Sequence, residues 1–117
     1  MSEARTRYLN MSAEEYSVVR NVLTAALESL GPEGERWVKN AFITQTGSRC
    51  MMGAVEVQDT PMFSRCDADL YLKHAIHMRT GKWLTIPHFN DALTTSFSDV
   101  KAVFEGALFQ LDSDAKV

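Results

Sequence analysis

The clearest structural signal in this chain lies in residues 12–30, which read SAEEYSVVRNVLTAALESL. Ser12 precedes Glu15 by three residues, the spacing of a capping box, in which each side chain accepts a hydrogen bond from the other residue's backbone N–H. Apolar residues recur every three or four positions and form one stripe of an amphipathic helix: Tyr16, Val19, Leu23, Ala26, Leu27 and Leu30. We predict a helix after Ser12 that ends at Gly31 and Pro32, because proline cannot continue it.

A second capped stripe lies near the other end of the chain. Ser96 and Asp99 have the spacing of an N-terminal cap. The apolar stripe that follows consists of Phe97, Val100, Phe104, Ala107, Leu108 and Leu111. Polar residues from Asp112 onward predict that this helix ends there. We expect the two helices to fold over the middle of the chain and close one hydrophobic interior.

A third helix is predicted from about Arg65 to Met78. Ser64 stands three residues before Asp67, which signals a helix start, and Gly81 signals its end. The predicted core face of this helix consists of Ala68, Tyr71, Leu72, Ala75 and Ile76.

The segments before this third helix are less regular. Residues 37–47 combine apolar and β-prone residues with a turn at Gly47, so they could form one arm of a short hairpin or a helix that frays into a loop. Residues 50–57 form a compact apolar run. Gly53 and Ala54 lie in its middle, and such small residues suit the close approach of another backbone.

The segment after the third helix is predicted to be extended and then to turn. Residues 83–86 are β-prone, and Pro87 favours an extended conformation for Ile86. Residues 88–91, with the sequence HFND, read as a turn. The whole pattern predicts a mainly α fold, a compact single domain of residues 1–117 with about four helices and one or two short extended segments. Residues 1–11 and 112–117 are predicted to be polar tails.

Composition narrows the class of protein. Of 117 residues, 45% are hydrophobic and 23% are charged, which is typical of one folded domain. The net charge of −3 argues against nucleic acid as a partner, because phosphate neutralisation supplies most of that affinity. There is no apolar segment typical of a secretory signal and no run of the roughly 18 apolar residues that a membrane span needs. We therefore expect a cytoplasmic protein in which Cys50 and Cys66 are reduced thiols.

Two short motifs resemble those of a known family. Residues 47–55 read GSRCMMGAV and follow Trp37, and residues 89–91 read FND and precede Thr95, Val100 and Ala107. Together they resemble a family of small bacterial and phage proteins classed as a domain of unknown function, with a Gly-x-x-Cys-x-x-Gly-Ala core and an aromatic-Asn-Asp turn before the last helix. The resemblance covers roughly residues 20–108. The family usually has tryptophan at the position of Phe89, and leucine or alanine at those of Met51 and Met52. It implies one domain and no particular reaction.

Cys50 is a candidate nucleophile. It lies where a turn passes into a predicted helix, and the positive end of a helix dipole stabilises a thiolate. His88, or alternatively His74 or His77, could act as base, with Asp91 or Asn90 orienting the imidazole. No nucleophile signature surrounds Cys50, so the alternative, a small buried apolar side chain beside Gly53 and Ala54, is favoured. An enzyme is therefore less expected than a binding protein.

A metal site has weak support. His74 and His77 are three residues apart and could ligate zinc together with Cys66, Asp67 or His88. The chain contains neither Cys-x-x-Cys nor His-Glu-x-x-His. We predict no metal and no cofactor.

A local positive cluster is the candidate ligand site. It consists of Lys73, His74, His77, Arg79 and Lys82, with Trp83 beside it. Such a cluster could bind a phosphate, a nucleotide or an acidic protein surface, or it could be a solvated helix face. Asn90 and Asp91 could contribute to a ligand site, although such pairs more often bond the backbone and fix their own loop.

The leading functional prediction is a small non-enzymatic protein-interaction or regulatory module, phage- or defence-related, that binds another protein or itself. Met51, Met52, Met62 and Phe63 are the predicted interface, since methionine and aromatic side chains suit adaptable protein contacts. The alternatives are a thiol-dependent hydrolase or transferase that uses Cys50, and a binder of a small phosphorylated ligand at the patch from Lys73 to Lys82.

Overall fold

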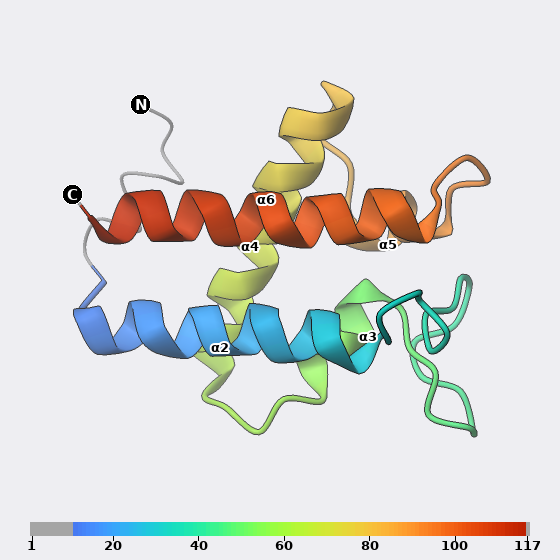
Figure 1. Ribbon diagram of the computed structural model, residues 1–117, viewed down its shortest axis with the longest axis horizontal. Helices are drawn as coiled ribbons and strands as arrows, with labels where there is room; N and C mark the ends of the chain where they lie inside the picture. The colour runs from blue at the N-terminus through green and yellow to red at the C-terminus, as the bar shows by residue number, and fades with distance from the viewer. Residues whose placement is uncertain (1–10, 117) are drawn as a thin grey trace.

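The computed structural model describes residues 11–116 and confirms the prediction of a mainly helical protein (Figure 1). Residues 37–47 form an irregular loop that isolated backbone bridges tie to Arg49 at Trp37 and Ile43, so this loop is neither the helix nor the regular hairpin arm we considered. Five helices lie within the described residues, one more than expected. They are α2 (Ala13–Ser29), α3 (Met51–Glu56), α4 (Met62–Thr80), α5 (Ile86–Asp91) and α6 (Phe97–Ala115).

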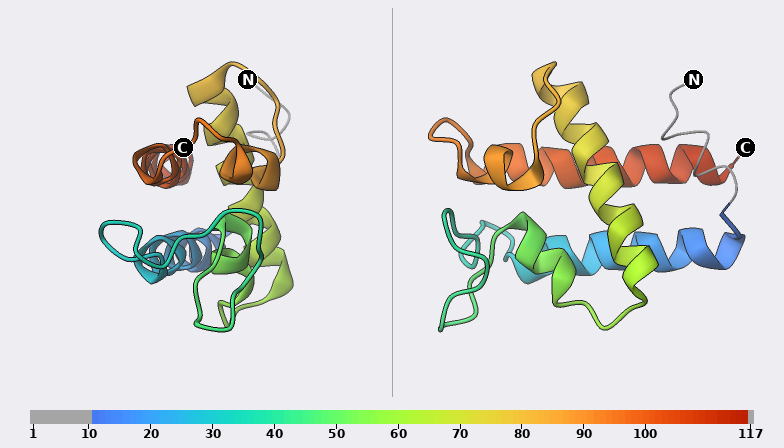
Figure 2. Two further views of the ribbon diagram at one scale, coloured as in Figure 1. Left: turned by 90° about the vertical axis from the view of Figure 1, so that its right-hand side faces the viewer. Right: turned by 180° about the vertical axis from the view of Figure 1, so that it is seen from behind.

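The helices form two layers. α2 and α6 lie side by side and antiparallel, and α4 crosses behind both of them at a steep angle (Figures 1 and 2). The short helices α3 and α5 lie on the α4 side, near the end of the molecule that carries the 31–49 loop (Figure 2). None of the helices in residues 11–116 is long and apolar enough to cross a membrane.

Both predicted N-terminal caps are present, and each of them is a capping box. At the start of α2 the side chains of Ser12 and Glu15 each accept a hydrogen bond from the other residue's backbone N–H, and Ser96 and Asp99 do the same at the start of α6. The backbone N–H of Ser12 donates to the Glu15 carboxylate and lowers its pKa. The two stripes meet α4 in the core, whose largest fully buried side chains include Tyr71, Phe104, Leu23, Leu30, Met51, Leu72, Ile76 and Leu111.

The ends of α4 and α6 differ from expectation. α4 begins at Met62 after Pro61, one turn before the Ser64 signal, and no side chain caps it. α6 continues to Ala115 rather than ending at Leu111. Asp114 explains the extension, because it is buried and accepts a hydrogen bond from the Tyr71 hydroxyl at 2.7 Å. The predicted polar tail is therefore part of the last helix up to residue 115.

The segment predicted as a turn is the helix α5. Thr85 caps it by accepting a hydrogen bond from the backbone N–H of His88, and Pro87 occupies its first turn. Proline is tolerated there because the first N–H groups of a helix have no partner within the helix. Ile86 is therefore helical rather than extended.

Gly53 confirms the expected close approach of another backbone. A Cβ atom on Gly53 would lie 2.3 Å from the carbonyl oxygen of Phe42, so α3 and the 31–49 loop meet without room for a side chain. In contrast, a Cβ on Gly106, in the exposed middle of α6, would meet Ala75 Cβ at an ordinary 3.7 Å.

We predict that Gly53→Ala lowers the free energy of unfolding by about 1–3 kcal/mol, because the added methyl group forces the two backbones apart. Gly106→Ala is the matched control, and it should raise this free energy by about 0.5–1 kcal/mol, since alanine is the better helix former. Urea unfolding of both variants measures the difference. Equal effects of the two substitutions would contradict the close packing at Gly53.

Candidate functional site

A groove between α3, α4 and α5 has a largely apolar lining. We call it the α4 groove; its volume is about 390 Å³. Its apolar lining residues are Met52, Leu70, Ile86 and Pro87. Its other lining residues are Cys66, Asp69, Lys73 and Thr85. Concave apolar surfaces with a few polar groups are the usual form of binding sites.

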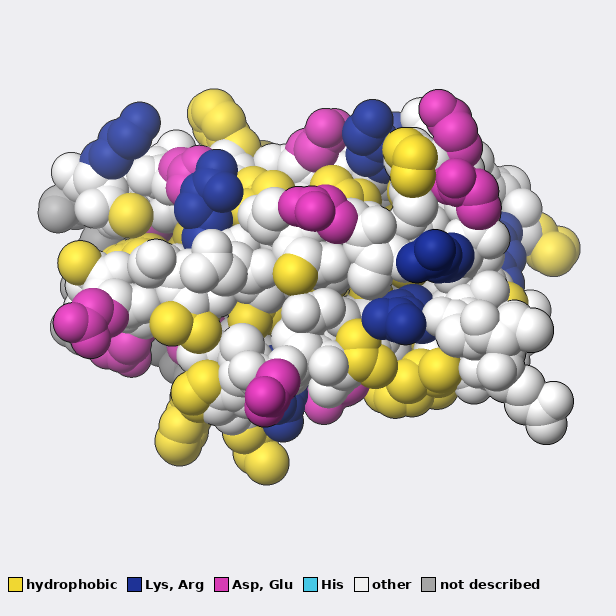
Figure 3. Space-filling view, turned by 60° about the horizontal axis from the view of Figure 1, so that its bottom comes forward, with side chains coloured by type: hydrophobic (Ala, Val, Ile, Leu, Met, Phe, Trp, Pro, Cys, Tyr) yellow, Lys and Arg dark blue, Asp and Glu magenta, His cyan; other side chains and the backbone are white. Residues whose placement is uncertain are grey.

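The first turn of α4 extends this apolar surface. Met62 and Phe63 precede Cys66 and Leu70 at helical spacing, so all four lie on the same side of α4. Met62 is 69% exposed and Phe63 is 80% exposed. Hydrophobic side chains project from the lower edge of the face drawn in Figure 3. We call Met62 and Phe63, together with the α4 groove, the α4 face.

The predicted interface residues divide between the core and this face. Met51 is completely buried, so it packs in the core rather than meeting a partner at the surface. Met52 lines the α4 groove, and Met62 and Phe63 lie on the α4 face. Three of the four nominated residues are therefore accessible on one side of the molecule.

Asp69 is the residue of this site that the sequence analysis missed. Its carboxylate oxygen Oδ1 is buried and accepts no hydrogen bond from the described residues, 11–116. Burial, and next the charge of the nearby Glu56, raise the pKa of Asp69 to about 7, although Arg65 acts in the opposite direction. The sequence did hold a sign of it. Asp69 lies three residues after Cys66 and four before Lys73, so these residues share a side of the helix that begins with Met62 and Phe63.

A second hollow, of about 430 Å³, adjoins the α4 groove and shares Met52 and Pro87 with it. Cys50 and Asp91 both line this hollow, whereas His88 lines a different one. The structure therefore brings together only two members of the proposed Cys-His-Asp set.

Cys50 has a structural role. It is 7% exposed, and its Sγ accepts a hydrogen bond from the Gly53 backbone N–H at 3.3 Å, which caps α3. This matches the alternative of a buried thiol, since the sulfur serves the start of a helix.

Asn90 is fully buried and uses both of its polar atoms within the protein. Its Oδ1 accepts from Trp37 Nε1 at 2.7 Å and from the Met51 backbone N–H at 3.0 Å. Its Nδ2 donates to the Val38 carbonyl at 3.1 Å and to Asp91 Oδ1 at 2.9 Å. These four bonds match the full capacity of an amide side chain. The side chain of Asn90 is thus engaged in fixing the loop rather than pointing into a cavity.

Asp91 completes the same network. Its Oδ1 also accepts a hydrogen bond from the backbone N–H of Asn40 at 2.8 Å. Asn40 has a positive φ of 62°, a left-handed conformation that asparagine tolerates better than most residues. The bond from Asp91 helps to hold this strained point of the loop.

The predicted positive cluster is divided among three places. Lys73 lines the α4 groove. His77 stacks on Trp83, with ring centroids 3.8 Å apart and planes 4° apart. Arg79 and Lys82 line a third hollow together with His88.

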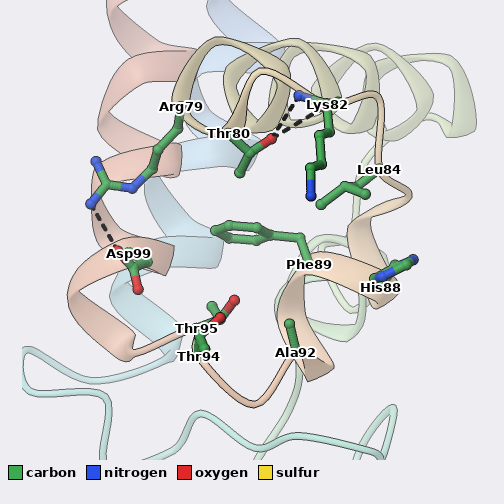
Figure 4. A pocket seen from close by; sticks show the side chains of 10 residues that line it. All are labelled: Arg79, Thr80, Lys82, Leu84, His88, Phe89, Ala92, Thr94, Thr95 and Asp99. Carbon is green, nitrogen blue, oxygen red and sulfur yellow. Dashed lines mark hydrogen bonds and ion pairs between the residues drawn. The ribbon is translucent and has the colours of Figure 1, made fainter.

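This third hollow lies between α4, α5 and α6 and has a volume of about 590 Å³ (Figure 4). The ring of Phe89 lies across it, and the Lys82 side chain extends toward that ring and Leu84 (Figure 4). Arg79 turns to the opposite side, where it donates to Asp99 Oδ1 at 2.8 Å. The hydrogen bond from the backbone N–H of Ser96, and next this bond from Arg79, lower the pKa of Asp99. Arg79 is therefore already paired.

The histidines considered for zinc do not form a ligand set. Within residues 11–116, no group of three or more His, Cys, Asp or Glu side chains is placed to hold a metal ion.

These features define a small helical domain with an apolar groove beside a hydrogen-bonded loop. The chain belongs to a family of unknown function, DUF6197, whose model matches residues 15–109. This confirms the resemblance to a family of unknown function, whereas the motifs quoted for it and a bacterial or phage origin stay predictions. No curated protein and no solved structure is significantly similar to the chain.

Proposed function

We propose that this protein is a non-enzymatic interaction module that binds another protein through the α4 face. The observation that carries the proposal is that the exposed Met62 and Phe63 lie on the same side of α4 as the residues Cys66 and Leu70 of an apolar groove. Single exposed apolar residues are ordinary, but a contiguous apolar surface marks an interaction site. An aromatic side chain beside a groove is a typical anchor of protein interfaces. We further propose a regulatory role in the cytoplasm of a bacterium or in a phage.

Cys66 gives a direct test, because it is exposed and lines the groove whereas Cys50 is buried. We expect iodoacetamide to label Cys66 in the folded protein and Cys50 only after unfolding. A benzophenone maleimide attached to Cys66 should then crosslink one partner protein in extracts of the cells that produce this chain. The variant Phe63→Ser should reduce the yield at least fivefold, since it removes an exposed anchor without touching the core.

The matched control carries the same label on the exposed side of α2, in the double variant Cys66→Ser, Ser17→Cys. Mass spectrometry identifies the adducts, and the purified partner is then titrated with both proteins. Equal crosslinking from the two positions, or undiminished binding by Phe63→Ser, would contradict the α4 face as the binding surface.

A second candidate function is binding of a small phosphorylated ligand in the hollow of Figure 4. Lys82 favours it, because this side chain extends into the hollow and forms no ion pair with any residue of the 11–116 range. An apolar floor at Phe89 with a cation above it suits a ring that carries a phosphate.

On this second proposal, ADP at about ten times its dissociation constant should raise the melting temperature by roughly 4–8 °C. Lys82→Ala should abolish the shift, and Lys73→Ala should preserve it, since Lys73 lines the α4 groove instead. Differential scanning fluorimetry with a panel of nucleotides measures this. No shift with any nucleotide, or a shift that survives Lys82→Ala, would rule the site out.

A further inference from the structure

Asp69 is a carboxylate without a dedicated partner in an otherwise apolar groove. Its Oδ1 is buried and accepts no hydrogen bond from residues 11–116. Leaving a buried carboxylate oxygen unpaired destabilises a protein, and such groups usually have a functional or solvent partner. The structure thus holds an acceptor in place beside an apolar surface.

Neither of the basic neighbours of Asp69, Arg65 and Lys73, forms a hydrogen bond or an ion pair with its carboxylate. Arg65 forms an ion pair with Glu56 of α3 at 3.6 Å and donates to the Thr60 carbonyl oxygen at 2.5 Å. Lys73 lines the same groove one turn further along α4, but the described part of the chain shows no ion pair between it and Asp69. α5 contributes Thr85, Ile86 and Pro87 to the groove, none of which carries a charge.

A lysine or arginine side chain fits this combination of groups. Its methylene stem packs on apolar lining such as Leu70 and Ile86, while its charged end reaches a carboxylate. The apolar surface also continues beyond the groove to Met62 and Phe63, which one small molecule would not cover. A polypeptide that presents an apolar side chain next to a basic one would cover both parts.

We infer that the α4 groove binds a segment of a partner protein in which a lysine or arginine lies beside an apolar residue, with Asp69 as the counter-ion of the basic side chain. This inference rests on the proposed function and adds the chemistry of the partner.

Binding of a basic side chain by Asp69 depends on pH. With a pKa of about 7, Asp69 is partly protonated near neutral pH, and only its ionised form pairs with a cation. Affinity is therefore highest above pH 7 and falls as the pH decreases through this pKa. A single group of this pKa weakens binding about tenfold between pH 8 and pH 6. The titratable or charged groups around Asp69 are Glu56, Arg65, Cys66 and Lys73.

The test uses a library of random 12-residue peptides displayed on phage. Peptides that bind the wild-type protein are selected after depletion on Leu70→Glu, which places a charge in the groove. We expect the enriched sequences to carry lysine or arginine next to leucine, isoleucine, methionine or phenylalanine. The best peptide is then synthesised and titrated calorimetrically at pH 6 and pH 8.

Asp69→Asn is the decisive variant, since it keeps the shape of the side chain and removes its charge. It should weaken the peptide at least tenfold at pH 8 and abolish the pH dependence. Asp59→Asn removes a carboxylate from an exposed loop residue and should change nothing. Thermal unfolding of each variant verifies that it is folded.

The outcomes separate the two proposals. Selected peptides without basic residues, or unchanged binding by Asp69→Asn, overturn the role of Asp69 and leave the interaction module standing. If the selection yields no peptide that binds the wild type better than Leu70→Glu, both proposals are overturned. Self-association of the chain that Asp69→Asn abolishes would show that a second copy fills the groove, and would also overturn the inference.

Discussion

The side-chain amide of Asn90 connects α5, α3 and the loop before α3. The helical patterns of the sequence do not determine how these three segments are placed relative to one another. Three of its four hydrogen bonds join α5 to the Trp37 indole, the Val38 carbonyl and the first backbone N–H of α3, and the fourth goes to Asp91 of α5 itself. The loop between α2 and α3 has no regular helix or strand of its own, so such bonds define its path. A fully satisfied polar network inside a core specifies one arrangement, because any other would leave buried groups unpaired.

The position of the α4 groove follows from this network. Met52 comes from α3 and Pro87 from α5, and both line the groove and the neighbouring hollow. Asn90 bonds the start of α3 from within α5, so it ties together the two helices that carry these side chains. α4 supplies the opposite wall, with Asp69 and Leu70. The surface proposed for binding is thus shaped by a buried amide on one side and by a long helix on the other.

The parts of this fold that could be predicted are those with local causes. The helices α2 and α6 carry capping boxes and complete apolar stripes, which depend only on neighbouring residues. α5 was missed because a proline two residues into a short helix looks the same in sequence as one that ends an extended segment. The 37–47 loop gave mixed signals because bonds to Asn90 and Asp91, some 50 residues away, determine it.

The candidate site was only partly predictable for the same reason. Met62 and Phe63 could be nominated from residue type, whereas Met51 belongs to the core and Asp69 is a half-buried residue of a groove that α3 and α5 form with α4. Residues of the one predicted positive cluster also lie at different sites. Lys73 lines the groove, and Lys82 lines the hollow of Figure 4. A cluster of charges along a helix does not reveal which side each one takes, because helical residues three to nine apart face several directions.

The Asn90 amide holds the irregular part of the protein to its helices, and urea unfolding of Asn90→Ala tests this role most directly. The substitution leaves the Trp37 indole and the Met51 backbone N–H without acceptors, and each buried unpaired group costs about 1–3 kcal/mol. We predict that the free energy of unfolding falls by about 2–4 kcal/mol, compared with less than about 0.5 kcal/mol for Asn21→Ala on the exposed side of α2. Equal stability of the two variants would contradict the account.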